Sequence, residues 1–268
     1  MEYIFIDGKK VDMLGFGTYK MSSSAAREAV PYALEAGYRR IDTATMYDNE
    51  EGIGEALAEC GIPRGELFLT TKLWTDIKCA DDVFRSVEGS LKKLRTSYID
   101  MLLIHWPTEN NLKVWKGMEK LKKEGVLKGI GLSNFKIHHI EDILKEAQIK
   151  PEWNQLEIHP YFQNRETVEY CKKQGIVAEA WSPLKRGEAL KDPVINGIAA
   201  KYGKSAAQVI LRYDLTEGVA AVPKSTNPER IKENISIFDF SLSDEDIEKI
   251  KKLDSNKRSY RDPDNHGF

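Results

Sequence analysis

The sequence predicts a (β/α)8 TIM barrel that carries an N-terminal β-hairpin and a short C-terminal tail. Eight short apolar runs with strand character follow the hairpin, and segments with helical periodicity separate them. The chain has 268 residues, and eight βα units need roughly 250. A doubly wound open sheet would use fewer strands and a G-x-G-x-x-G turn, of which Gly15-x-Gly17 is only a fragment. We therefore expect one barrel domain over residues 1–268.

The order of elements follows from turn residues and periodicity. Asp7-Gly8 favours a tight hairpin turn between strands at 3–6 and 9–12. The three helices that follow the first three barrel strands are expected at 25–36, 50–59 and 80–94. The eight barrel strands are expected at residues 14–17, 39–42, 67–72, 99–105, 129–133, 153–159, 176–181 and 220–223.

Composition excludes several classes of function. A net charge of −2 gives no general field that would attract nucleic acid or an anionic membrane. No segment approaches the roughly 18 apolar residues of a membrane span, and the N-terminus lacks a signal pattern, so a cytoplasmic protein is expected. Cys60, Cys79 and Cys171 lie far apart without a CxxC motif. This spacing argues against a disulfide framework and against a zinc site.

Four residues at or beside predicted strand ends form a candidate catalytic set: Asp42, Tyr47, Lys72 and His105. The C-terminal ends of barrel strands meet at one face, so residues far apart in sequence converge there. The charge of Lys72 would lower the pKa of the Tyr47 phenol from its ordinary value of about 10, and Asp42 would hold Lys72 charged. His105 would hydrogen-bond the substrate oxygen. This set suits protonation of an alkoxide as it forms.

Each of these residues also has a structural explanation. An Asp after a strand often caps a turn, a Tyr in a loop often only packs, and a Lys at a strand end is often solvated. Trp74 and Trp106 adjoin two of the four and could be core residues or the aromatic rim of a polar pocket. The combination of an acid, a phenol, a cation and an imidazole on three consecutive strand-loop units favours the catalytic interpretation.

A second candidate site lies where the last strand meets a helix. Asn227 is a good N-cap and Pro228 suits the first helical position, so free N–H groups and the helix dipole should favour an anion there. The alternative is an exposed basic helix start. Because the chain is acidic overall, we favour a phosphate site. Two cations and two hydroxyls would line it: Lys224, Arg230, Ser225 and Thr226.

Short motifs follow one another along the chain: Asp42-Thr43-Ala44-x-x-Tyr47-x-Asn49-Glu50-x-x-x-Gly54, Thr71-Lys72-Leu73-Trp74, His105-Trp106-Pro107, Ser133-Asn134-Phe135, Asn154-Gln155-x-Glu157-x-His159-Pro160, Trp181-Ser182-Pro183-Leu184 and Pro223-Lys224-Ser225. In these motifs and their order the chain resembles the aldo-keto reductase superfamily, from the hairpin to about Leu253. The resemblance implies a barrel enzyme that reduces aldehydes and ketones with NADPH. It makes Tyr47 the general acid, lets Lys72 and Asp42 tune that acid, and makes His105 orient the carbonyl.

The resemblance also assigns cofactor contacts. The residues at the nicotinamide and its ribose would be Asp42, Ser133, Asn134, Gln155 and Trp181. The residues along the rest of the cofactor would be Gly17, Thr18, Ser182, Pro183, Leu184, Lys224, Ser225, Thr226, Arg230, Glu233 and Asn234. The 2′-phosphate, which favours NADPH over NADH, would be held by Lys224, Ser225, Thr226 and Arg230, and Glu233 and Asn234 would lie at adenine.

Departures from the family pattern bear on the substrate. Trp181 stands where Tyr is common, as in microbial members resembling 2,5-diketo-gluconate and glyoxal reductases, and Tyr19 replaces a frequent tryptophan. The loops after His105 and Ser182 and the tail are short, which implies an open pocket for small polar carbonyls such as methylglyoxal or diketo-sugar acids. We expect a monomer without metal, nucleic-acid or membrane partners. The expected pocket lining is Tyr19, Met46, Trp74, His105 and Trp106.

Two other functions are compatible with parts of this pattern. A binding or redox-sensing protein could keep the barrel and the cofactor site without turnover. A phosphate-binding lyase or isomerase could use Lys72 as a Schiff-base amine. The complete set of Asp42, Tyr47, Lys72 and His105 favours the reductase over the first, and the 2′-phosphate cluster favours it over the second.

Overall fold

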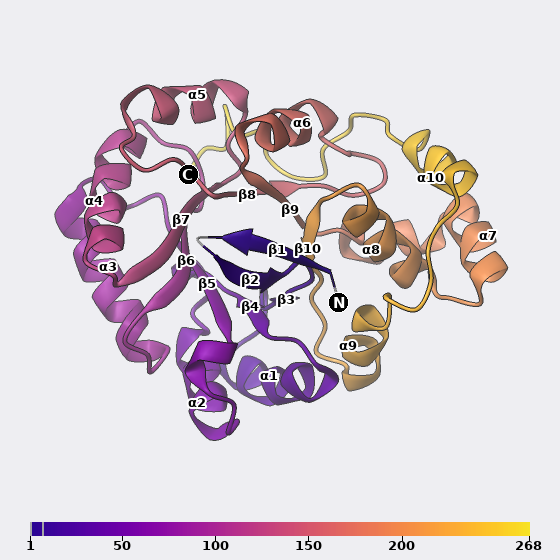
Figure 1. Ribbon diagram of the computed structural model, residues 1–268, viewed down its shortest axis with the longest axis horizontal. Helices are drawn as coiled ribbons and strands as arrows, with labels where there is room; N and C mark the ends of the chain where they lie inside the picture. The colour runs from indigo at the N-terminus through magenta and orange to yellow at the C-terminus, as the bar shows by residue number, and fades with distance from the viewer. Residues whose placement is uncertain (1, 7) are drawn as a thin grey trace.

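The computed structural model describes residues 2–6 and 8–268, and in this part of the chain eight parallel strands form a barrel inside a ring of helices (Figure 1). Backbone hydrogen bonds from Gly15 N to Ala221 O (2.8 Å) and from Gly17 N to Pro223 O (3.0 Å) join the first barrel strand to the last. The predicted fold class is therefore confirmed. The barrel strands are β3 (Phe16–Gly17), β4 (Arg40–Asp42), β5 (Phe68–Leu73), β6 (Ile99–Ile104), β7 (Leu127–Ser133), β8 (Trp153–Glu157), β9 (Val177–Trp181) and β10 (Ala220–Val222).

The helices surround this barrel, and one cluster of apolar side chains lies among the helices Pro193–Tyr202, Ala206–Thr216 and Asp244–Lys251 themselves. Strand boundaries differ from the predicted ones by a few residues, because a strand here ends where its backbone stops pairing rather than where its apolar run ends. The α-helices are α1 (Ser23–Ala36), α2 (Glu50–Glu59), α3 (Ala80–Lys93), α4 (Asn111–Lys123), α5 (Ile137–Glu146), α6 (Arg165–Gln174), α7 (Pro193–Tyr202), α8 (Ala206–Thr216), α9 (Pro228–Ile235) and α10 (Asp244–Lys251).

The hairpin of β1 (Tyr3–Ile6) and β2 (Lys9–Asp12) covers one end of the barrel (Figure 1). Lys9 Nζ donates to Leu67 O (3.3 Å), just before β5, and Arg40 Nε donates to Asp12 O (2.9 Å). These contacts place the hairpin at the N-terminal ends of the strands. Asp7 of the expected turn lies outside the described residues, and Gly8 has a φ of 78°. The candidate functional residues lie at the opposite end of the barrel, where the strands have their C-terminal ends.

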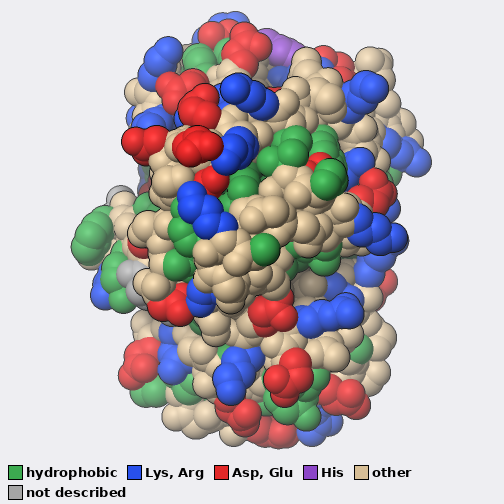
Figure 2. Space-filling model, turned by 90° about the vertical axis from the view of Figure 1, so that its right-hand side faces the viewer, with side chains coloured by type: hydrophobic (Ala, Val, Ile, Leu, Met, Phe, Trp, Pro, Cys, Tyr) green, Lys and Arg blue, Asp and Glu red, His purple; other side chains and the backbone are tan. Residues whose placement is uncertain are grey.

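The outer surface mixes charges of both signs. Figure 2 shows lysine and arginine interspersed with aspartate and glutamate on the face that carries α7 and α10. This distribution agrees with the net charge of −2. Within residues 2–6 and 8–268, no helix reaches the combination of length and apolar character that crossing a bilayer requires.

Gly52 in α2 is required by a close approach of two helices. A Cβ at this position would lie 1.9 Å from the backbone oxygen of Ser23. The Gly52 N–H donates a hydrogen bond to Ser23 Oγ (2.9 Å), which holds the two helices at this distance. Helix α1 therefore contacts the α2 backbone directly. This contact supports the helix that begins just after the Tyr47 loop.

We predict that Gly52→Ala lowers the free energy of unfolding by about 1–3 kcal/mol, since a backbone must move to admit the methyl group. The measurement is the thermal midpoint, which should fall by roughly 2–4 °C per kcal/mol. Gly89→Ala in α3 is the matched control, because nothing lies within 4 Å of its Cβ position. That variant should be neutral or slightly more stable. Equal midpoints for the two variants would contradict the close approach.

Candidate active site

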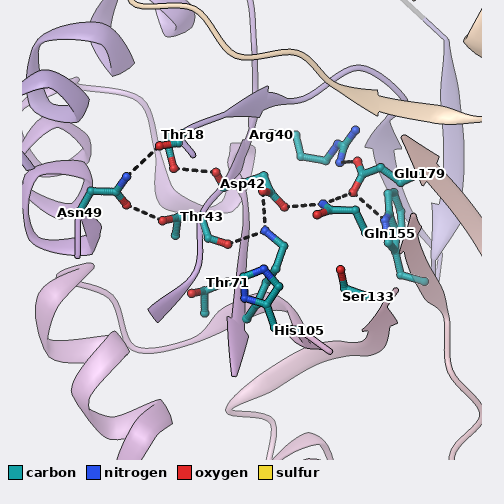
Figure 3. Close-up of polar contacts among 12 residues, drawn as sticks. Thr18, Arg40, Asp42, Thr43, Asn49, Thr71, His105, Ser133, Gln155 and Glu179 are labelled. Carbon is teal, nitrogen blue, oxygen red and sulfur yellow. Dashed lines mark hydrogen bonds and ion pairs between the residues drawn. The ribbon is translucent and has the colours of Figure 1, made fainter. Parts of the chain in front are cut away.

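The catalytic candidates lie together at the C-terminal end of the barrel. Asp42 ends β4, Lys72 lies in β5, His105 directly follows β6, and Tyr47 ends a 3₁₀ turn (Thr45–Tyr47). Lys72 Nζ donates to Asp42 Oδ1 (2.6 Å) and to Thr43 O (2.8 Å), as the dashed lines at Asp42 and Thr43 show (Figure 3). The Lys72 side chain is fully buried. The same Nζ lies 5.1 Å from the centre of the Tyr47 ring. The four groups therefore form one cluster.

The Tyr47 phenol is half-buried between two rings. Its ring centre lies 5.0 Å from that of Tyr19 and 5.6 Å from that of His105. Burial, with a further contribution from the charge of Asp42, raises the pKa of Tyr47 well above its ordinary value. The expectation that Lys72 lowers this pKa is wrong, because the lysine charge is engaged by Asp42. The phenol stays protonated at neutral pH and can act as a proton donor.

His105 is a neutral imidazole in this environment. Burial, and then the charge of Lys72, lower its pKa well below the ordinary value. Its Nδ1 is buried, and no hydrogen bond from the described residues reaches it. The Trp74 ring packs edge-on against it, with 5.1 Å between ring centres. A neutral ring of this kind can donate one hydrogen bond to a substrate oxygen.

Asn49 supports the loops around Asp42, and sequence reasoning gave it no role. Asn49 Nδ2 donates to Thr18 O (2.9 Å), and Asn49 Oδ1 accepts from Thr43 Oγ1 (2.6 Å). Thr18 Oγ1 in turn donates to Asp42 O (2.8 Å). The asparagine of the Asp/Tyr motif thus ties together the loops that follow β3 and β4 (Figure 3). The sequence signal that could have indicated this role is the position of Asn49 inside that motif.

Asp42 has a second set of contacts, on its other oxygen. Gln155 Nε2 donates to Asp42 Oδ2 (2.8 Å) and also to Glu179 Oε2 (2.7 Å). Burial raises the pKa of the Asp42 carboxyl, Lys72 opposes this shift, and the charge of Glu179 adds to it. Asp42 is therefore held from both sides, by an ammonium and by an amide.

The residues expected at the nicotinamide surround this cluster. Ser133 ends β7 and pairs in register with Gln155. Asn134, in a left-handed conformation with a φ of 64°, donates from Nδ2 to His105 O (3.0 Å) and accepts at Oδ1 from Trp181 Nε1 (2.8 Å). Both ends of the Asn134 amide thus have partners within the protein. The Trp181 ring is fixed in orientation by this contact.

The expected phosphate site has the predicted local structure. Asn227 Oδ1 accepts from Arg230 N (3.1 Å) as the N-cap of α9, and Pro228 is its first residue. Lys224, Thr226 and Arg230 are exposed, and within the described chain neither Lys224 nor Arg230 forms an ion pair. Two unpaired cations beside a helix N-terminus fit a phosphate group.

The other expected cofactor residues lie in β3, in the loop after β9, and in or just before α9. Gly17 ends β3, and a Cβ there would lie 2.8 Å from Val222 O, so this glycine serves barrel closure. Glu233 accepts a hydrogen bond from the Ser205 hydroxyl, and Ser225 and Asn234 are buried. Three residues continue from β9 with Ser182 at a φ of 55°: Ser182, Pro183 and Leu184.

The C-terminal tail covers part of the expected substrate pocket. Tyr19 and Met46 are 37% and 39% exposed, as pocket residues would be. Trp106 is only 5% exposed, because three aromatic side chains of the tail pack on it, and the Phe268 ring also lies 4.9 Å from that of Trp74. The expected open pocket is therefore wrong on this side. The tail residues on Trp106 are Tyr260, His266 and Phe268, with ring centres 5.9, 5.4 and 5.4 Å away.

An ionic cluster at the start of α5 holds the tail in this position. Lys136 Nζ lies 2.6 Å from carboxylate oxygens of both Asp262 and Asp264. The imidazoles of His138 and His139 lie 3.1 and 3.3 Å from Asp264 Oδ1. Burial and the neighbouring His138 lower the pKa of His139 to about 4, so Lys136 supplies the charge at neutral pH. The residues are too far apart in sequence for this cluster to be predicted.

His138, His139 and Asp264 are residue types that bind metals, but the His139 tautomer does not suit a metal ion. His139 Nδ1 accepts from the backbone N–H of Lys136 (3.2 Å). In the neutral ring the proton then lies on Nε2, which faces Asp264, so that nitrogen has no lone pair for a metal. We interpret the cluster as a clasp between α5 and the tail.

Comparison with known proteins assigns the family. The sequence model of the Aldo/keto reductase family matches residues 13–255 of this chain. The chain belongs to the aldo/keto reductase family. This membership makes the protein an NADP-dependent oxidoreductase, as its motifs implied, and NADP(H) its cofactor.

Individual relatives of this aldo/keto reductase agree over nearly the full length. Glyoxal reductase of Bacillus subtilis is 46% identical over 260 residues, which cover 96% of this chain and 94% of that protein. Methylglyoxal reductase DkgA of Escherichia coli is 43% identical, with coverage of 97% and 96%. The crystal structure of Bombyx mori aldo-keto reductase in complex with NADP superposes with a TM-score of 0.92 at 36% identity, covering 98% of this chain and 96% of that one.

We predict that Asp264→Ala loosens the tail, because Lys136 and both histidines lose a common partner. The rate of tryptic cleavage after Arg258 and Arg261, followed by mass spectrometry, should rise roughly threefold or more if local opening becomes easier. Asp239→Ala, which removes a surface ion pair with Lys204, is the control and should leave this rate unchanged. Equal cleavage rates in the two variants would show that the clasp does not hold the tail.

Proposed function

We propose that the protein reduces small polar aldehydes and ketones to alcohols with NADPH, with Tyr47 as general acid. The observation that carries this proposal is a protonated phenol beside a neutral imidazole and a buried lysine at the end of the barrel. The names of the bacterial relatives, glyoxal reductase and methylglyoxal reductase, support small dicarbonyl compounds as substrates. We also propose that residues 1–268 act as one domain, as a monomer in the cytoplasm.

The chemistry of the chain follows from the protonation states. Bound NADPH supplies the hydride. His105 donates a hydrogen bond to the carbonyl oxygen and so orients it. Tyr47 transfers its proton to that oxygen as negative charge develops there. The Lys72 ammonium stays 5.1 Å from the centre of the Tyr47 ring, bonded to Asp42 rather than to the phenol. Asp42 keeps Lys72 at this position.

The cofactor is held by three groups of residues in this proposal. Trp181 offers its ring face to the nicotinamide, and Ser133 and Gln155 offer polar groups to its carboxamide. Asn134 acts there through the orientation of Trp181. Lys224 and Arg230, with the hydroxyls beside them, would hold the 2′-phosphate, and the loop of Ser182, Pro183 and Leu184 would hold the pyrophosphate.

The arrangement of Lys72 speaks against a Schiff-base lyase. Its nitrogen is fully buried and donates to both Asp42 and Thr43, so no lone pair faces a substrate. A binding protein without turnover would need none of the contacts that hold Tyr47, Lys72 and His105 together. The reductase accounts for all of them.

We predict that Tyr47→Phe reduces kcat/KM for methylglyoxal by roughly 10²–10⁴-fold, since proton transfer by a side chain contributes about this factor. The dissociation constant of NADPH should change little, because the phenol is needed for the proton and not for the cofactor. Both quantities are measured through NADPH absorbance and fluorescence. Tyr32→Phe on the surface of α1 is the control. Unchanged turnover in Tyr47→Phe would refute the assignment of the acid.

We predict that changing Lys224 and Arg230 together to Ala raises the KM for NADPH by at least roughly tenfold and leaves the KM for NADH nearly unchanged. Each lost charged hydrogen bond costs about 1.5–3 kcal/mol, and only NADPH carries the phosphate that accepts it. Lys232→Ala, another exposed cation of α9, is the control. Equal effects on the two cofactors would remove the 2′-phosphate assignment.

The two shifted pKa values also predict the pH dependence of reduction. A raised pKa keeps Tyr47 in its protonated, active form until well into the alkaline range, and a lowered pKa keeps His105 neutral through mildly acidic pH. Therefore kcat/KM for reduction should vary less than about twofold between about pH 6 and pH 9. A loss of activity with an apparent pKa inside this range would contradict the assignment.

A further inference from the structure

A line of buried charged and amide groups runs through the barrel interior from Arg40 to Asp42 (Figure 3). Arg40 Nη1 donates to Glu179 Oε1, and Gln155 Nε2 donates to Glu179 Oε2 (2.7 Å) and to Asp42 Oδ2 (2.8 Å). Lys72 then donates to Asp42 Oδ1 (2.6 Å). All five residues are buried, with at most 3% of each exposed. A cation stands at each end of the line, and one amide joins the two carboxylates in its middle.

The strands place these residues in line. Arg40 and Asp42 are two residues apart in β4, so both side chains lie on the same face of the strand. Gln155 in β8 and Glu179 in β9 are paired in register. Gly15 leaves room for the guanidinium, since a Cβ there would lie 2.8 Å from Arg40 Cζ. The ion pair of Arg40 and Glu179 thus spans the end of the barrel away from the substrate.

Stability alone does not explain this buried ion pair. Hydrophobic residues of similar volume often replace a buried pair without loss, or with a gain of about 1–4 kcal/mol. Here both members of the pair also form hydrogen bonds with other residues. Arg40 Nη2 donates to Met13 O (2.7 Å), and Trp153 Nε1 donates to Glu179 Oε2 (2.9 Å). Glu179 Oε2 is therefore a fixed acceptor, and its second donor is the Gln155 amide.

The two carboxylates determine which way the Gln155 amide faces. Each of its N–H groups points to one carboxylate, whereas an amide oxygen in that place would face two negative oxygens. Gln155 Oε1 is then the outward acceptor, and no hydrogen bond from residues 2–6 or 8–268 reaches it. The carboxamide of a nicotinamide ends in an N–H donor. Glu179 thereby determines that Gln155 presents Oε1, the atom that can accept from this N–H donor.

We infer that Glu179 is a positioning residue of this reductase, which fixes the Gln155 amide so that Oε1 accepts the carboxamide N–H of NADP(H), and that Arg40 holds Glu179 in place. Neither residue touches the cofactor or the substrate in this account. The inference rests on the proposed function, because it assumes that the nicotinamide binds beside Gln155.

The test compares two double variants that both lack the ion pair. In Arg40→Met with Glu179→Gln, an amide oxygen still accepts from Gln155 and Trp153. In Arg40→Met with Glu179→Leu, no acceptor remains at position 179, and only Asp42 Oδ2 still accepts from Gln155. Calorimetry then gives the dissociation constants of NADP+ and of its 3-acetylpyridine analogue, in which a methyl ketone replaces the carboxamide and removes the N–H donor. Thermal midpoints of both variants show that they are folded.

We expect the wild type and the Gln variant to bind NADP+ roughly tenfold more tightly than the analogue, as the loss of one partner of a buried hydrogen bond predicts. The Leu variant should show a smaller preference, about threefold or less, because Asp42 Oδ2 alone then holds its Gln155 amide. Equal preferences in the two variants would overturn the inference while leaving the reductase assignment intact. A wild type that binds neither nucleotide would refute both.

A measurement on the wild type covers the case in which the Leu variant does not fold. Both side-chain N–H signals of Gln155, assigned by their loss in Gln155→Leu, should exchange with solvent far more slowly than those of exposed glutamines. Fast exchange of either signal would overturn the inference, since it would show that the amide is not held between the two carboxylates.

Discussion

The ion pair between Lys72 and Asp42 is the interaction on which the candidate site depends. Both groups are buried, and removing one partner of such a pair costs about 3–5 kcal/mol because the other charge is left without compensation. The pair keeps the lysine charge beside the Tyr47 ring without bonding it to the phenol. It also links the loop after β4 to β5, since Lys72 bonds Thr43 O as well. The position of the lysine charge and the position of the loop after β4 therefore both depend on Lys72.

The fold could be predicted from sequence because its signals are local and repeated. Apolar runs, helical periodicity and the Asn227-Pro228 helix start each depend on neighbouring residues. Strand ends were less accurate, as in β3, where Leu14 pairs with Ala221 only as an isolated bridge. Whether a given residue still pairs depends on the partner strand, which lies far away in sequence.

The candidate site was predictable where motifs carry it and not where it depends on contacts across the barrel. The motifs named Asp42, Tyr47, Lys72 and His105, but the direction of the Tyr47 pKa shift required knowing what Lys72 is bonded to. Glu179 reads as a charge in an apolar strand until Arg40 is found opposite. The covering of Trp106 by the tail depends on the clasp at α5, which joins segments more than a hundred residues apart.

The central claim is that these fixed side chains present a protonated phenol and an oriented amide to a nicotinamide and a carbonyl. A crystal structure of the wild-type protein with NADP+ tests it most directly. We expect the nicotinamide to stack on Trp181, with its carboxamide nitrogen within hydrogen-bond distance of Gln155 Oε1 and its reactive carbon facing the Tyr47 hydroxyl. A nicotinamide away from Tyr47, or a Gln155 amide turned with its oxygen toward Glu179, would contradict it.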